Sequence, residues 1–91
     1  MILGFRHKGL QVFFDTGQAS GIVPNHANRL RLILGVLDSI ETLQDVPKSL
    51  DLHPLKGALA EYYSVKVNKN WRIIFRFADG IVSEVDYLDY H

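Results

Sequence analysis

The chain has 91 residues with 47% hydrophobic and 22% charged side chains, enough for the modest core of a single soluble domain over residues 1–91. It contains no cysteine, which excludes disulfide bonds and thiolate metal ligands. Ten Lys and Arg residues balance ten Asp and Glu residues, but this neutral total conceals an acidic segment, residues 38–51, followed by a basic one, residues 53–77.

The first half of the chain predicts two helices after a short extended segment. Residues 2–5, ILGF, could form a first strand, and the basic residues after them stand in the wrong order for a signal peptide. No apolar run reaches the roughly 20 residues of a membrane span, so we expect a cytosolic protein. A helix is expected from residue 7, capped by Gly17, and a longer one over residues 24–40, opened by Pro24 or Asn25. The apolar faces consist of Leu10, Phe13 and Phe14 in the first helix and Ala27, Leu30, Ile33, Leu34, Leu37 and Ile40 in the second.

Two features of this half could be read as functional. The stretch FFDTG, residues 13–17, resembles the signature of aspartic proteases, but these enzymes need two such aspartates, and here the motif occurs once at a helix end. A capping role is therefore favoured. His7 and His26 are expected to be solvated on helix starts or outer helix faces. The four histidines lack ligand spacing, so no metal site is expected.

The second half predicts an irregular segment followed by a three-stranded antiparallel meander. Pro47, Pro54 and Gly57 rule out a long regular element over residues 41–61. Alternating side chains predict strands at residues 62–67, 71–77 and 81–88. Three-residue loops, with Asn70 and Gly80 left-handed, are expected to join them. This register pairs Val67 with Trp71, Val65 with Ile73, Lys66 with Arg72, Phe77 with Ile81, Ile73 with Val85, Arg72 with Asp86 and Trp71 with Tyr87.

The register sorts the sheet into two faces. The face that the helices must cover holds Tyr63, Val65, Val67, Trp71, Ile73, Phe75, Phe77, Ile81, Val85 and Tyr87. The other, which we call the open face, holds Tyr62, Ser64, Lys66, Arg72, Arg76, Glu84 and Asp86. Because it is largely basic, the open face is a candidate anion-binding surface.

Titratable side chains gather where two segments should meet the open face. The loop LHPLKG, residues 52–57, carries His53 and Lys56, and the chain finishes with Asp89, Tyr90 and His91, which we call the C-terminal group. Cleavage of a phosphodiester needs a cationic clamp, a proton acceptor and a proton donor. Lys56 and Arg72 could form the clamp, and His53 and the C-terminal group could exchange protons. Alternatively, these segments have only structural roles. The LHPLKG loop would then be a rigid connection, Tyr87 and Tyr90 would pack against neighbours, and His91 would be a frayed terminus.

Several stretches resemble, in order and spacing, the HigB-like toxins of bacterial toxin–antitoxin pairs, which belong to the RelE superfamily. They are FRHKGL (5–10), FFDTG (13–17), LHPLKG (52–57), VNKNWRIIFRF (67–77) and VDYLDYH (85–91). The resemblance implies an α+β fold with two N-terminal helices packed on one face of a small, mainly antiparallel sheet. It also implies cleavage of messenger RNA on the ribosome by attack of a ribose 2′-hydroxyl on its own 3′ phosphate, without a metal or other cofactor. A HigA-like helix-turn-helix antitoxin is the implied partner.

Matching the motifs residue by residue places the catalytic positions at His53, Lys56, Arg72, Asp89, Tyr90 and His91. Lys66, Lys69 and Arg76 are expected to bind RNA. The chain departs from the family pattern at Ala58, where an acid is common, and at Tyr63, where a tryptophan is common. Two other functions stay open: a relative that docks on the ribosome or RNA without cutting, and a protein-interaction module whose basic face meets an acidic partner.

Overall fold

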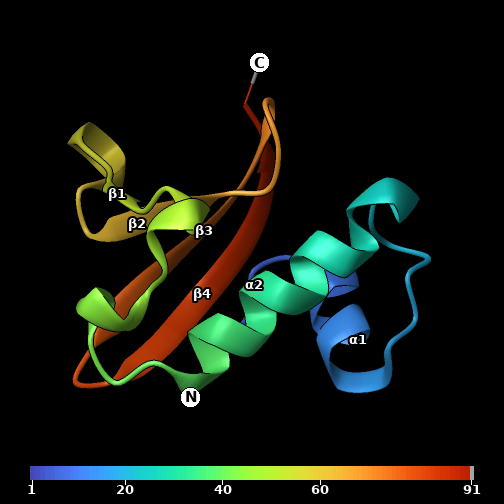
Figure 1. Ribbon diagram of the computed structural model, residues 1–91, viewed down its shortest axis with the longest axis horizontal. Coiled ribbons are helices and arrows are strands. Elements are labelled where there is room, and N and C mark those ends of the chain that lie inside the picture. Colours follow the sequence, from blue (N-terminus) through green and yellow to red (C-terminus); the bar gives the residue numbers. More distant parts are fainter. Residues whose placement is uncertain (91) are drawn as a thin grey trace.

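The computed structural model describes residues 1–90 as two helices packed on one face of an antiparallel sheet (Figure 1). The helices are α1 (Lys8–Thr16) and α2 (Ala27–Ser39), and the strands are β1 (His53–Pro54), β2 (Tyr62–Lys66), β3 (Trp71–Ala78) and β4 (Ile81–Asp89). The strands lie in the order β1-β2-β3-β4. The expected α+β architecture is confirmed, with one strand more than the predicted meander because the short β1 adds to β2.

Local interactions define where the helices begin and end. The His7 side chain accepts a hydrogen bond from the Leu10 backbone N–H (3.0 Å) at the start of α1. Gly17 ends α1 in the left-handed region (φ 82°) and donates its N–H to the Phe13 carbonyl (2.8 Å), as predicted. Pro24 opens a 3₁₀ turn, Pro24–His26, and the expected helix becomes α-helical only at Ala27.

The core lies between the helices and the helix-covered face. Its fully buried members are Leu10, Leu30, Ile33, Leu34, Leu37, Leu50, Val65, Ile73, Phe75, Val82 and Val85. The predicted helix faces are thus largely confirmed. Val82, rather than the expected Ile81, is the first residue of β4 to enter the core.

The β3–β4 connection differs from the expected three-residue loop. Asp79 (φ 52°) and Gly80 (φ 78°) form a two-residue turn, and Ala78 pairs with Ile81. Two left-handed central residues are typical of a type I′ hairpin, whose twist matches that of the strands. The expected pairs of β3 and β4 are therefore wrong. The observed pairs include Ile73 with Tyr87, Arg72 with Leu88, Ile74 with Asp86 and Trp71 with Asp89.

A β-bulge in β4 keeps the two faces of the sheet distinct despite this turn. Between the pairs Arg76–Ser83 and Ile74–Asp86, β4 has one residue more than β3, and Glu84 is left-handed (φ 49°). Without the extra residue, a two-residue turn would put Glu84 and Asp86 on the helix-covered face. The bulge instead returns Val85 and Tyr87 to the core, as the face assignment required.

The β2–β3 turn is closed by a side chain. The Asn68 Oδ1 atom accepts from the backbone N–H groups of Asn70 (2.9 Å) and Trp71 (2.8 Å). This side-chain turn replaces the left-handed Asn70 that was expected, since Asn70 is not among the positive-φ residues. The predicted pairs Val65–Ile73 and Lys66–Arg72 are confirmed.

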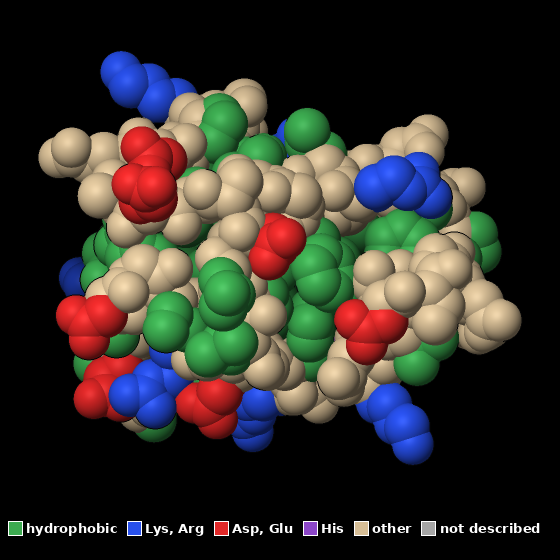
Figure 2. Space-filling view, turned by 90° about the horizontal axis from the view of Figure 1, so that it is seen from below, with side chains coloured by type: hydrophobic (Ala, Val, Ile, Leu, Met, Phe, Trp, Pro, Cys, Tyr) green, Lys and Arg blue, Asp and Glu red, His purple; other side chains and the backbone are tan. Residues whose placement is uncertain are grey.

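Residues 2–5 do not form a strand of the sheet but cover the outer edge of β4. Ile2 and Phe5 make isolated parallel bridges with Val82 and Val85. Across residues 1–90, no helix is both long and apolar enough to cross a bilayer. Figure 2 shows acidic and basic side chains interspersed around exposed hydrophobic ones on the face that it presents.

Candidate functional site

The antiparallel register builds the candidate site on the open face. His53 of β1 pairs with Ser64 of β2, and Lys66 pairs with Arg72 of β3. Because alternate residues of a strand share one face, His53, Ser64, Lys66 and Arg72 lie on the same side of the sheet. The long irregular segment before β1 therefore delivers His53 to the edge of the surface that carries Arg72.

Asp51 connects two of the predicted catalytic residues. Its Oδ1 lies 2.9 Å from His53 Nε2, and its Oδ2 lies 3.5 Å from Arg72 Nη2. The Arg72 Nη1 also donates to Ser64 Oγ (3.3 Å), and Ser64 is buried. Asp51 has a left-handed backbone (φ 56°), which directs its carboxylate back toward the sheet from the end of a 3₁₀ turn. The imidazole and the guanidinium are thus held through one carboxylate.

Asp51 is the residue that sequence reasoning missed. In the sequence, Asp51 is only the last acid of the acidic segment. Its position two residues before His53 was the available signal, because a carboxylate at that distance can orient an imidazole.

The C-terminal group begins where β4 meets β3 at the same end of the sheet. Asp89 pairs with Trp71, the neighbour of Arg72 in sequence. The Tyr90 backbone N–H donates to the Asn70 carbonyl, and the Tyr90 side chain is exposed. His91 lies outside the described residues. Tyr90 is therefore anchored by its backbone while its phenol stays accessible.

Lys56 lies in the loop between β1 and β2. It is exposed and directly precedes the 3₁₀ turn Gly57–Leu59. Its position leaves the ammonium group accessible to an anion approaching this loop.

The three predicted RNA-binding residues occupy unlike environments. Lys66 is half-buried beside Arg72, and Lys69 is exposed in the β2–β3 turn. Arg76 lies at the opposite end of the open face, paired with Glu61 (2.9 Å) and Glu84 (3.3 Å). The open face is thus basic mainly at the Lys66 and Arg72 end, which corrects the expectation of a largely basic surface.

His26 contradicts its predicted solvation. It is 7% exposed, it forms a hydrogen bond with the Tyr87 hydroxyl, and its Nε2 lies 2.8 Å from the Asn68 amide nitrogen. Burial lowers the pKa of His26 and raises the pKa of Tyr87. The sequence indicates a helix start here but does not show that β4 and the β2–β3 turn pack over it. Within residues 1–90, no group of three or more His, Asp or Glu side chains is placed to hold a metal ion.

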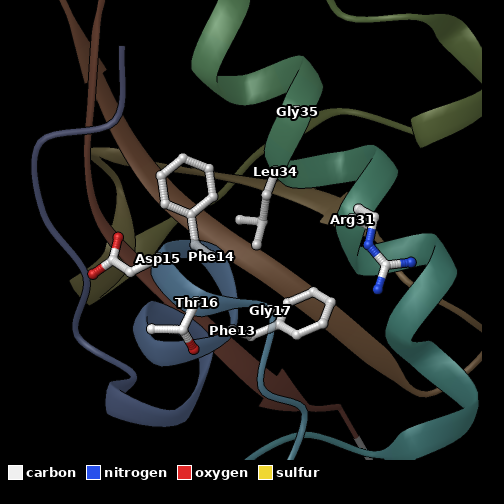
Figure 3. A pocket seen from close by; sticks show the side chains of 8 residues that line it. All are labelled: Phe13, Phe14, Asp15, Thr16, Gly17, Arg31, Leu34 and Gly35. Atoms are coloured by element: carbon white, nitrogen blue, oxygen red, sulfur yellow. The ribbon is translucent and has the colours of Figure 1, made fainter.

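The FFDTG stretch lines a groove of about 380 Å³ between α1 and α2 (Figure 3). Its other lining residues are Arg31, Leu34 and Gly35. The Arg31 guanidinium lies 5.4 Å from the centre of the Phe13 ring, and Figure 3 shows Asp15 on the other side of the groove. No second carboxylate lines this groove beside Asp15, and Gly17 caps α1. The capping interpretation is therefore confirmed.

Comparison with known proteins places the chain in a family. Residues 3–91 match the family model "RelE-like toxin of type II toxin-antitoxin system HigB". The chain is 37% identical over 92 residues to "Endoribonuclease HigB" of Proteus vulgaris, and the match covers 100% of both chains. We conclude that the chain belongs to the RelE-like HigB toxins of type II toxin–antitoxin systems.

Solved structures show the same fold at low sequence identity. YafQ from E. coli strain BL21(DE3) superposes with a TM-score of 0.67 and 18% identity, covering 98% of this chain and 91% of that one. YoeB in the heterotetrameric YoeB–YefM toxin–antitoxin complex from Staphylococcus aureus gives 0.62 and 19%, covering 100% and 95%. The RelE-like architecture implied by the sequence motifs is therefore confirmed.

Proposed function

We propose that this HigB-like toxin is an endoribonuclease that cuts messenger RNA on translating ribosomes and so stops translation. The observation that carries the proposal is the Asp51 carboxylate, which holds His53 and Arg72 together on the open face. The end of β4 brings Asp89 and Tyr90 to the same end of the sheet as Arg72. The name of the Proteus vulgaris relative, an endoribonuclease, supports the same reaction class.

In the proposed reaction, a ribose 2′-hydroxyl gives up its proton and attacks the adjacent 3′ phosphorus. The bond from phosphorus to the 5′ oxygen of the next nucleotide breaks, and that oxygen takes up a proton. The products are a 2′,3′-cyclic phosphate and a 5′-hydroxyl. His53, Asp89, Tyr90 and His91 are the candidates for the two proton transfers, and no metal takes part.

The cations supply the electrostatic part of the catalysis. Negative charge grows on the non-bridging phosphate oxygens as the fifth bond to phosphorus forms. The planar Arg72 guanidinium can donate to two of these oxygens, while Lys56 approaches as a flexible point charge. Arg72 is already oriented by Asp51 and Ser64, so little reorganisation is needed during the reaction.

Binding of RNA is assigned to Lys66, Lys69 and Arg76. Lys66 pairs with Arg72, and Lys69 lies in the adjoining β2–β3 turn, so both are placed for neighbouring phosphates. Arg76 must first exchange its carboxylate partners for RNA. With a net charge of zero, the chain has little general attraction for RNA. We therefore expect the ribosome to position the substrate and naked RNA to be cut poorly.

The proposed partner is a HigA-like antitoxin with a helix-turn-helix motif. The S. aureus neighbour was solved as a toxin–antitoxin complex, which supports an antitoxin as the class of partner. An adjacent gene encoding a helix-turn-helix protein, and neutralisation by its product, would support the specific pairing.

The decisive experiment induces the chain in a bacterium and maps transcript 5′ ends with and without active translation. We expect growth arrest and new 5′-hydroxyl ends that form only when translation is active. An Arg72→Ala variant serves as the inactive control. Arrest with intact transcripts would instead favour a toxin relative that binds the ribosome without cutting.

His91 is tested separately, because it carries a proposed proton transfer. A His91→Ala variant should fold and bind the antitoxin but cleave slowly, since a terminal residue makes few packing contacts. Cleavage at the parental rate would exclude His91, and the proton transfers would then fall to His53, Asp89 and Tyr90.

A further inference from the structure

A buried histidine outside the candidate site is hydrogen-bonded at both ring nitrogens. His26, at the start of α2, lies with Nδ1 against the Tyr87 hydroxyl of β4 and with Nε2 2.8 Å from Asn68 Nδ2. The indole ring of Trp71 packs edge-on against the imidazole, with the ring centres 5.5 Å apart. This one side chain, just before α2, thus contacts Asn68 of the β2–β3 turn, Trp71 of β3 and Tyr87 of β4.

The bonding pattern fixes the protonation of His26. The Asn68 Oδ1 is occupied by the backbone N–H groups of Asn70 and Trp71, so the Asn68 amide NH₂ must face the imidazole. An NH₂ group only donates, and therefore His26 Nε2 must be an unprotonated acceptor. The single proton then lies on Nδ1 and is donated to the Tyr87 oxygen, which also receives the Val23 N–H (3.4 Å).

Protonation of His26 would break this arrangement. A second N–H on Nε2 would point at the Asn68 NH₂ group, so that two donors face each other. Rotating the Asn68 amide could remove the clash, but the rotation would sacrifice both hydrogen bonds that close the turn. The turn would then lose its shape at Asn70.

The surroundings of His26 offer no compensating charge. Its polar neighbours are Tyr87 from β4 and Asn68 from the turn, and His7 of the α1 start packs on the far side of Tyr87. Arg29, one turn further along α2, directs its guanidinium to the Lys66 and Ser49 carbonyls. Among residues 1–90, no ion pair involves His26.

The turn and β4 lead directly into the candidate site. The Asn70 carbonyl accepts the Tyr90 backbone N–H, and Trp71 immediately precedes Arg72 and pairs with Asp89. Tyr87 precedes Tyr90 by three residues and stacks on Trp71 with the ring centres 4.5 Å apart. A movement of Asn68 or Tyr87 therefore moves the residues that position Asp89 and Tyr90.

We propose that neutral His26 is a positioning residue that holds Asp89 and Tyr90 in place at the end of β4, and that its protonation loosens these two residues and slows cleavage at acidic pH. The inference rests on the proposed ribonuclease function, but its structural part can be tested without that activity. Trp71 is the only tryptophan and contacts the imidazole, so its fluorescence reports on His26 directly.

The test compares three variants with the parent chain. In His26→Gln, the amide cannot be protonated but can still accept from Asn68. Asn68→Asp keeps an oxygen for the turn and offers a carboxylate oxygen to protonated His26. His26→Phe keeps a ring and removes both hydrogen bonds. His53→Gln is the control for a histidine that lies in the candidate site.

The first readout is independent of RNA. The Trp71 fluorescence of the parent and of His53→Gln should change as the pH falls from 7.5 to 5, and that of His26→Gln should not. At pH 7.5, exchange of the Tyr90 amide hydrogen should be faster in His26→Phe than in the parent. Unchanged exchange in His26→Phe, or a fluorescence transition that persists in His26→Gln, would overturn the proposal.

The second readout is cleavage on ribosomes. At pH 7.5, His26→Gln should cleave near the parental rate and His26→Phe about 10- to 100-fold more slowly, because a small misplacement of reacting groups is costly. The loss of rate between pH 7 and 5.5 should be weaker in His26→Gln and Asn68→Asp than in the parent. An unchanged pH profile in both variants would overturn the proposal. If the parent itself does not cut, the proposed function fails, and the fluorescence and exchange results still decide the role of His26.

Discussion

Asp51 lies 2.9 Å from His53 and 3.5 Å from Arg72, so a single half-buried carboxylate contacts the two side chains that the candidate site depends on. The contact joins the acidic segment to the basic one. It also explains how the irregular segment before β1 can hold the His53 imidazole on the face of the sheet that carries Arg72.

Replacing Asp51 with Asn tests this role. Asn tolerates a left-handed backbone, so the loop should keep its shape while the charge is lost. We expect ribosome-dependent cleavage to fall roughly 10- to 100-fold because His53 and Arg72 lose a shared orienting charge. The free energy of unfolding should change by less than about 1 kcal/mol, since partly exposed ion pairs contribute little. Parental cleavage by Asp51→Asn would show that the carboxylate is not needed to orient them.

Substituting Arg72 should lower the cleavage rate more than substituting any other cation of the open face. Arg72→Ala should lower the cleavage rate about 100- to 1,000-fold, the usual cost of losing one donor to a developing oxyanion. Arg72→Lys should recover only part of the rate because an ammonium cannot donate in a planar pair. Arg76→Ala is the matched comparison and should cost less, because Arg76 is proposed only to bind RNA and its guanidinium is already bound by two carboxylates. Equal losses for Arg72→Ala and Arg76→Ala would argue for general charge rather than a clamp.

Replacing Gly9 or Gly21 with a larger residue should destabilise the fold, because the two backbones approach each other closely. A Cβ on Gly9 would lie 2.6 Å from the Gly21 carbonyl oxygen, and a Cβ on Gly21 would lie 2.6 Å from the Gly9 Cα. Each Gly→Ala change should destabilise the fold by about 1–3 kcal/mol because backbone must move. Gly35→Ala is the control: it lies within α2 with no atom within 4 Å of a new Cβ, and it should stabilise the fold by about 0.5–1 kcal/mol. Urea denaturation measures the free energy of unfolding of the three variants. An unchanged value for Gly9→Ala would contradict the close approach of the two backbones.

The bulge at Glu84 can be tested with a matched pair of variants. Glu84→Ala and Glu84→Gly remove the same contacts with Arg76 and Tyr62, but only Ala keeps a Cβ in the left-handed region. The Gly variant should therefore be about 1 kcal/mol more stable than the Ala variant, despite its greater freedom in the unfolded chain. A more stable Ala variant would show that the backbone at residue 84 leaves the left-handed region.

The stability of the fold should depend on pH through His26. Burial lowers the pKa of this group in the folded chain, so below about pH 6.5 the unfolded chain binds a proton that the folded chain does not. Stability should thus be constant above about pH 7.5 and fall as the pH drops through 6.5, until the lower folded pKa is reached. Thermal unfolding should show a smaller decrease between pH 7.5 and 5 in His26→Gln. An equal decrease in both chains would assign the effect to other groups.

The sequence predicted those parts of the fold that depend on local patterns. The helix faces, the Gly17 cap and the assignment of most β-residues to faces follow from period and turn chemistry and are confirmed, but Val82 takes the core position expected for Ile81. The register of β3 and β4 was not, because two compensating features, a tighter turn and a bulge at Glu84, leave nearly the same face pattern as one longer loop.

The candidate site shows the same division between local and non-local information. Motif resemblance selected His53 and Arg72, which the structure brings together, whereas Asp51 and the burial of His26 depend on contacts between distant segments. Contacts between distant segments produce no periodic pattern or local motif in a single sequence. A residue such as Asp51 becomes visible only when its loop is placed against the sheet.

The bridges from Ile2 and Phe5 to β4 also have a consequence for how the protein is made. These contacts join residues separated by nearly the whole chain, so they cannot form until β4 has left the ribosomal exit tunnel. Contacts of such long range slow folding, because a large loop must close before they form. During synthesis, the edge of β4 can therefore be covered only after β4 has emerged, and until then the proposed site lacks Asp89 and Tyr90.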